Sequence, residues 1–186
     1  MSSGRVRSFL LGALAVGLVA FGSGGTYSAF SSTTNNGGSG FSAGTVHLKD
    51  NDGGAVMFNV SGMKPSDAAR TSCITVTYDG SLDANVKLYA SALSNTGVEP
   101  YINLTVETGT TTSGYGDCTG FSSITTLYNG TLASYPTTYA SGLAEPGNPW
   151  STGEAHAYRF TVSVQNNAAA QGKTATVTFA WEAQNT

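Results

Sequence analysis

Residues 158–164 read Tyr-Arg-Phe-Thr-Val-Ser-Val, and this stretch decides the fold class. Its apolar side chains alternate with polar ones, which is the period of a β-strand that buries one face. The same alternation returns along the chain, so the sequence predicts an all-β protein. The further predicted strands lie at residues 46–48, 56–60, 74–78, 86–90, 102–107 and 174–181.

Turn-forming residues separate these strands. Asp50-Asn51-Asp52-Gly53-Gly54 and the pairs Asp79-Gly80 and Asn129-Gly130 consist of residue types that tolerate the positive φ of a tight turn. No stretch beyond residue 28 shows a sustained 3.6-residue period. Short strands with such turns predict a jelly-roll-like antiparallel β-sandwich, and we expect it to span residues 41–186 as one domain.

Residues 108–150 interrupt the strand pattern. They are rich in Gly, Ser, Thr, Tyr and Pro, and we interpret them as one long irregular insert. A strand at 123–131 and a turn of helix within 133–142 are the elements expected there. The aromatic residues of the insert allow an alternative function, a monomeric cell-surface binding module, although packing onto the sheet is the favoured interpretation. These residues are Tyr115, Tyr128, Tyr135, Tyr139 and Trp150.

The composition excludes two classes of protein. Charged residues make up 10% of the chain, the formal net charge is −3, and the Lys and Arg residues are scattered. A nucleic-acid-binding surface requires a basic patch, and the sequence contains none. A content of 40% hydrophobic residues argues against a charge-rich disordered chain.

The first 28 residues are expected to form a signal peptide. Arg5 and Arg7 precede an apolar run at residues 9–21, which is shorter than the roughly 20 residues of a membrane-spanning helix. Glycines and other small residues follow the run, as a signal peptidase requires. We therefore expect export, with membrane contact only through this segment before cleavage. A retained membrane anchor is the alternative.

The two cysteines, Cys73 and Cys118, are expected to form a disulfide. Two thiols in an oxidising compartment usually pair, and the bond would close a long loop. The chain-entropy model assigns such a crosslink roughly 3–4 kcal/mol of stability. Neither cysteine belongs to a Cys-x-x-Cys motif, so the sequence gives little support for zinc or redox chemistry.

The sequence offers few residues for catalysis. Its two histidines, His47 and His156, lack the His-Glu-x-x-His spacing of common zinc peptidases. Glu154 and His156 would share one face of a strand, and a metal site would have to combine them with His47, Asp50 or Asp52. We interpret these side chains as ordinary strand and turn residues, and we expect no catalytic residue, no metal and no cofactor.

Four stretches of the chain match one family in order. Residues 25–31 read Gly-Thr-Tyr-Ser-Ala-Phe-Ser, and residues 41–48 read Phe-Ser-Ala-Gly-Thr-Val-His-Leu. Residues 60–67 read Val-Ser-Gly-Met-Lys-Pro-Ser-Asp, and residues 177–184 read Val-Thr-Phe-Ala-Trp-Glu-Ala-Gln. They resemble the signal-peptide junction, the first strand, a turn and the last strand of the TasA/camelysin family of exported biofilm-matrix fibre proteins.

The resemblance implies a specific mode of assembly. A dedicated signal peptidase would cut between Ser28 and Ala29, and the new N-terminal segment of one subunit would add as a strand to the next subunit. Residues 35–40, rich in Asn, Gly and Ser, would form a flexible tether. The donor strand would consist of Ala29, Phe30, Ser31, Ser32, Thr33 and Thr34, in which Phe30 is the single large apolar anchor.

We therefore expect a secreted structural subunit of extracellular fibres or biofilm matrix, located in the matrix or at the cell surface. Its partner would be a second copy of itself in a homopolymer; further matrix components are left open and nucleic acid is excluded. Some camelysin-like relatives are called metalloproteases, so a secreted metallopeptidase is the second alternative. The sequence does not assign the acceptor groove, for which the edge near residues 41–48 is a candidate.

Overall fold

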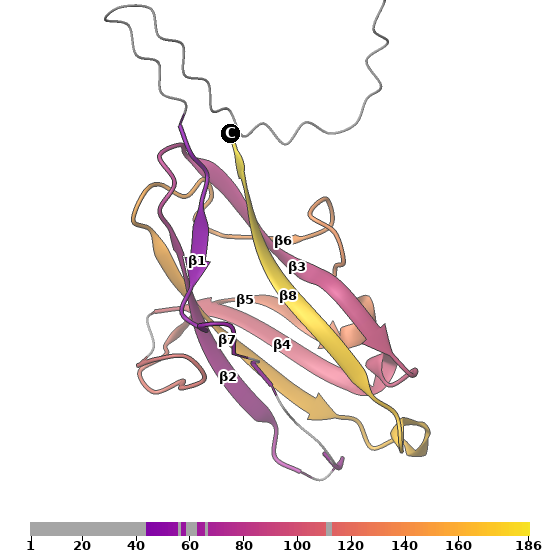
Figure 1. Cartoon of the computed structure of the whole chain (residues 1–186). Coiled ribbons are helices and arrows are strands. Elements are labelled where there is room, and N and C mark those ends of the chain that lie inside the picture. Colours follow the sequence, from indigo (N-terminus) through magenta and orange to yellow (C-terminus); the bar gives the residue numbers. More distant parts are fainter. Residues whose placement is uncertain (1–43, 56, 59–62, 66, 111–112) are drawn as a thin grey trace, which may run out of the picture.

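The computed structural model describes residues 44–55, 57–58, 63–65, 67–110 and 113–186. These residues form two antiparallel β-sheets that pack face to face (Figure 1), so the predicted β-sandwich is confirmed. The predicted signal peptide (residues 1–28), donor strand (29–34) and tether (35–40) lie outside the described residues, as does the cleavage position between Ser28 and Ala29.

The larger sheet has five strands in the order β1-β2-β7-β4-β5. Their register places Ile74 opposite Tyr158 and Leu104 opposite Val162, so the alternating apolar residues share the inner face. The strands are β1 (Leu48–Asp50), β2 (Arg70–Tyr78), β7 (Ala155–Val164), β4 (Ile102–Gly109) and β5 (Ser123–Thr131).

The smaller sheet has three strands in the order β6-β3-β8. They are β6 (Leu143–Ala144), β3 (Ala84–Asn95) and β8 (Ala175–Asn185). The described helices are short 3₁₀ turns: η1 (Glu99–Tyr101), η2 (Leu132–Ser134) and η3 (Ala168–Ala170). None of the helices among the described residues has the length and apolar character needed to cross a membrane.

Aromatic side chains from the two sheets meet in the core. Tyr158 and Phe160 of β7 lie fully buried, and their rings contact Trp181 and Phe179 of β8 at centroid distances of 5.0 and 4.7 Å. Full burial of one such side chain stabilises the fold by about 1.5–3 kcal/mol. The two sheets are therefore held together along the line where β7 and β8 cross.

Residues 108–150 are more regular than predicted. The predicted strand at 123–131 is present as β5, but it pairs with β4 along its length, and β6 adds a second strand. The predicted helix is reduced to η2, and the pair Asn129-Gly130, predicted as a turn, lies inside β5. Two register shifts between β4 and β5 break the alternation, which explains why this region looks irregular in the sequence.

The start of the domain also differs from the prediction. The expected strand at 46–48 is shifted to β1, which begins at Leu48. Parts of the expected strand at 56–60 lie outside the described residues, and Met57 and Phe58 belong to no strand. The predicted turn at 50–54 does follow β1, and Gly53 and Gly54 adopt φ values of 59° and 84°, which favour glycine.

The predicted disulfide between Cys73 and Cys118 is present, with 5.2 Å between the Cα atoms. It ties the loop around Cys118 to the outer face of β2, where the Gly116 amide donates to the Cys73 carbonyl at 2.8 Å. Arg159 of β7 secures the same region, because its guanidinium lies 4.8 Å from the Phe121 ring centre. A long connection is thus fixed on the face of the sheet opposite the core.

Candidate functional site

Strand β8 lies at an edge of its sheet. It pairs with β3 from Ala175 to Asn185, and among the described residues no strand pairs with its other side. The free N–H and C=O groups of such an edge are a template for a further strand. Figure 1 shows β8 in yellow running across the front of the sandwich beside β3.

A groove of about 920 Å³ follows this free edge. Thr176, Val177 and Thr178 all line it, although consecutive residues of a strand point to opposite faces. The groove therefore runs along the edge of β8 instead of over one face. Among the described residues that line it, none belongs to β3, which places it on the unpaired side of β8.

Apolar side chains of both sheets line the interior of the groove. Ile74, Leu104 and Val162 come from the inner face of the five-stranded sheet, and Phe179 and Trp181 come from β8. The last three of these remain half-buried, unlike the fully covered side chains deeper in the core. An added strand that covered them would contribute about 25 cal/mol for each Å² of apolar surface removed from water.

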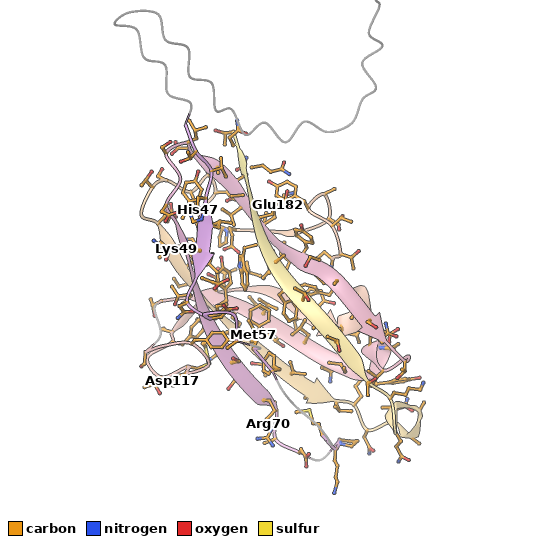
Figure 2. The ribbon with its side chains drawn as sticks, viewed as in Figure 1. His47, Lys49, Met57, Arg70, Asp117 and Glu182 are labelled. Atoms are coloured by element: carbon orange, nitrogen blue, oxygen red, sulfur yellow. A yellow bond between two sulfur atoms is a disulfide. The ribbon has the colours of Figure 1, made fainter. Side chains whose placement is uncertain are left out.

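The rim of the groove is polar. Asp50 lines it from the end of β1 and Asp52 from the turn that follows, and Lys173 lines it from the turn before β8. Burial is the largest influence on Asp50 and raises its pKa above the usual value, against the opposing effect of a hydrogen bond from the Asp52 backbone amide. In the view of Figure 2, Met57, which also lines the groove, lies between β2 and β8. The site thus combines an apolar interior with hydrated edges.

The opposite edge of the smaller sheet is covered by the chain itself, through residues 143–150. Leu143 and Ala144 pair with β3 as strand β6. Further along, the Asn148 side chain accepts from the Val86 amide at 2.7 Å and donates to the Val86 carbonyl at 2.8 Å. Trp150 then completes the contact, since its amide donates to the Ala84 carbonyl at 2.8 Å. Of the two edges of this sheet, the edge at β8 is therefore the one that the described part of the chain leaves open.

The candidate acceptor edge at β8 differs from the candidate suggested by the sequence, the edge near residues 41–48. β1, near residues 41–48, is an edge strand of the larger sheet but spans three residues. The sequence signal for β8 is ordinary alternation, typical of any core strand. The free edge of β8 depends on which strands pair, and strand order is not visible in a single sequence.

The aromatic residues of the insert pack within the domain. Trp150 is fully buried and Tyr135 is nearly so, and the Tyr135 ring contacts the rings of Tyr128 and Phe179 at 4.9 and 5.4 Å. The hydroxyl groups of the remaining two tyrosines donate to backbone carbonyls, Tyr115 to Ala55 and Tyr139 to Asn85. This geometry favours the packing interpretation over a surface platform for stacked ligands.

The residues considered for a metal site do not converge. His47 contacts Asp79 on the surface, whereas His156 lies between Glu145 and Glu154, so that each of its ring nitrogens faces a carboxylate. Both histidines, both cysteines and all eleven acidic residues of the chain lie in the described ranges. Within those ranges no three His, Cys, Asp or Glu side chains are placed to hold a metal ion. A catalytic zinc requires three protein ligands and an open position, and the described residues do not fit it.

The chain matches a known protein family over part of its length. The family model described as camelysin metallo-endopeptidase matches residues 7–98, a stretch that contains β1, β2 and β3 as well as the predicted donor strand and residues 7–28 of the predicted signal peptide. None of the curated proteins matches the chain significantly.

Proposed function

Because this chain belongs to the TasA/camelysin family, we propose that it is an exported structural subunit that polymerises into extracellular fibres by strand addition. The free edge of β8, with an apolar groove of about 920 Å³ beside it, is the observation that supports this function most directly. The occupant is the N-terminal segment of a second copy, residues 29–34.

The donor and the acceptor have compatible sizes and chemistry. A six-residue strand spans about 20 Å, whereas the eleven residues of β8 span about 36 Å, so the donor can pair along roughly half of the edge. Backbone hydrogen bonds supply most of the contact, and Phe30 packs against the apolar side chains of the groove. The surfaces on the two partners differ, so each added subunit presents a new free edge and the contact propagates into a fibre.

Cleavage after Ser28 is the trigger in this mechanism. Before cleavage the donor segment continues into the apolar run at residues 9–21, which holds it at the membrane. After cleavage the segment is free, and residues 35–40 form a flexible linker that allows it to reach a neighbouring subunit. The resulting fibres are located outside the cell, in the matrix or on the cell surface.

The oligomeric state of two purified forms tests this function. Protein that begins at Ala29 is expected to form polymers, whereas protein that begins at Gly37 lacks the donor and is expected to stay monomeric. Size-exclusion chromatography with light scattering, followed by electron microscopy, measures both. Circular dichroism provides the control, because the shorter form retains every described strand and should keep the same β-sheet signal.

Two results would contradict the donor role. One is equal polymerisation by both forms, which would place the contact elsewhere on the domain. The other is a monomeric Ala29 form whose N-terminal segment is protected from proteases, because the segment would then occupy the groove of its own subunit.

The metallo-endopeptidase activity in the description of the family is tested separately. We expect protein beginning at Ala29, purified without chelators and then supplied with Zn²⁺, to bind no stoichiometric zinc and to leave an unstructured protein such as casein intact. Metal analysis and a protease assay measure these two properties. Zinc-dependent hydrolysis that is lost in both the His47→Gln and the His156→Gln variant would indicate a catalytic zinc site and would overturn this expectation.

A further inference from the structure

Glu145, directly after β6, has its carboxylate buried in the core. Its side chain is fully shielded from solvent, and neither carboxylate oxygen has a hydrogen-bond partner with good geometry among the described residues. Burial of an unpaired carboxylate is costly, so this position requires a compensating charge or donor. The basic group beside it is His156, whose Nδ1 lies 3.5 Å from Glu145 Oε2.

His156 connects Glu145 to a second carboxylate. Its Nε2 lies 3.1 Å from Glu154 Oε1, and its ring packs on Trp150 at a centroid distance of 4.3 Å. The imidazole belongs to β7 of the larger sheet, whereas Glu145 belongs to residues 143–150, which cover the edge of β3. The pair therefore joins this covering segment to the opposite sheet.

The other titratable groups around Glu145 stay neutral near physiological pH. Burial, and then the Glu145 charge, raise the pKa of the Tyr158 and Tyr135 hydroxyl groups above the usual value for tyrosine. The neighbouring elements contribute side chains that do not titrate. They are Val76 of β2, Ala84 and Val86 of β3, and Trp181 of β8. Val76 lies opposite His156 in the sheet, and Trp181 contacts the ring of Tyr158.

We propose that Glu145 and His156 form a pH-sensitive latch that holds residues 143–150 on the edge of β3. With His156 protonated, the imidazolium compensates the buried carboxylate and the segment stays closed. Once His156 loses its proton, the buried Glu145 side chain loses its compensating charge, which weakens the contact that holds the segment closed. Opening then uncovers the β3 edge between Ala84 and Leu88, where the segment makes its backbone contacts.

The sign of the pH dependence follows from the contacts of His156. The contact with the Glu145 carboxylate is the largest influence and raises the pKa of His156 above 6.5, against the opposing effect of burial. A group whose pKa is raised by folding stabilises the folded state below its unfolded pKa. That contribution is fully present in mildly acidic solution and is lost as the pH rises through the folded pKa of His156.

Hydrogen exchange at two pH values tests the latch. In dilute protein beginning at Ala29, we expect the protection of the Val86 and Trp150 amides, corrected for the intrinsic exchange rate, to fall severalfold between pH 5.5 and 8.5. The central pairing of β4 with β7 provides the internal reference and should keep its protection. Glu145→Gln, which removes the buried charge but keeps the shape, should abolish the difference between the two pH values.

The second histidine supplies a matched control. His47 lies on the surface against Asp79, so His47→Gln leaves the surroundings of Glu145 intact and should retain the full pH effect. An NMR titration of the His156 ring in the unchanged protein avoids any dependence on variants that fail to fold, and it should give a pKa above 6.5. A pKa at or below that value, or an equal loss of protection in Glu145→Gln, would overturn the latch.

Discussion

Protein that begins at Ala29 and carries Val162→Asp is expected to remain monomeric at concentrations at which we expect the unchanged protein to polymerise. Val162 is half-buried at the groove, so a carboxylate there stays hydrated while the groove is empty. An inserted donor strand would bury that charge without a partner, which costs several kcal/mol. Since 1.4 kcal/mol corresponds to a tenfold change, we expect the affinity to fall by at least about 100-fold. Sedimentation velocity over a concentration series measures the effect.

The neighbouring residue on the same strand gives the control. Thr161 precedes Val162 on β7 and points to the outer face, where it lies opposite Thr71 and Thr105. Thr161→Asp therefore introduces the same charge on the face away from the groove, and it should polymerise normally. If both variants polymerise, and circular dichroism shows that each is folded, the groove takes no part in assembly.

The two assembly-deficient forms should complement each other. Protein from Ala29 with Val162→Asp keeps its donor strand but has a blocked groove, whereas unchanged protein from Gly37 keeps its groove but has no donor. A mixture should form a dimer of one copy of each, and neither form should dimerise alone. This result would isolate a single donor–acceptor contact, and its absence would indicate that the two changes act on different processes.

Replacement of both cysteines is the other change with a large expected effect. Cys73→Ala with Cys118→Ala should lower the free energy of unfolding by about 3–4 kcal/mol, because the loop closed over a separation of 45 residues regains its freedom in the unfolded chain. Urea unfolding measures this loss. Reduction of the unchanged protein with a thiol reagent provides the control and should lower its stability by a similar amount.

The disulfide should leave assembly intact. Cys73 faces the outer side of β2, whereas its neighbour Ile74 faces the groove, so the crosslink and the proposed acceptor lie on opposite faces of the sheet. The variant without cysteines is therefore expected to polymerise below its unfolding transition. A stability change under about 1 kcal/mol would contradict the assignment of this stabilisation to the lost freedom of the unfolded chain.

The sequence predicted the strands whose pattern is local. The alternation at residues 74–78, 158–164 and 175–181 marks β2, β7 and β8, because a strand that buries one face needs an apolar residue at every second position. The disulfide was equally predictable from the sequence, since a chain with two cysteines allows one intramolecular bond. The strand predicted at residues 123–131 is present as β5, but its full pairing with β4 was not predicted, because register shifts break the alternation there.

The sequence by itself determined a β-sandwich with a crosslink, and it also supplied a candidate donor segment at residues 29–34. Only the tertiary structure decided that β8 keeps a free edge, that this edge borders an apolar groove, and that Glu145 lies against His156. The physical reason is how far apart in the sequence the interacting residues lie. Strand formation follows from the spacing of neighbouring side chains, whereas edges, grooves and buried charge pairs depend on which distant segments of the chain pack together.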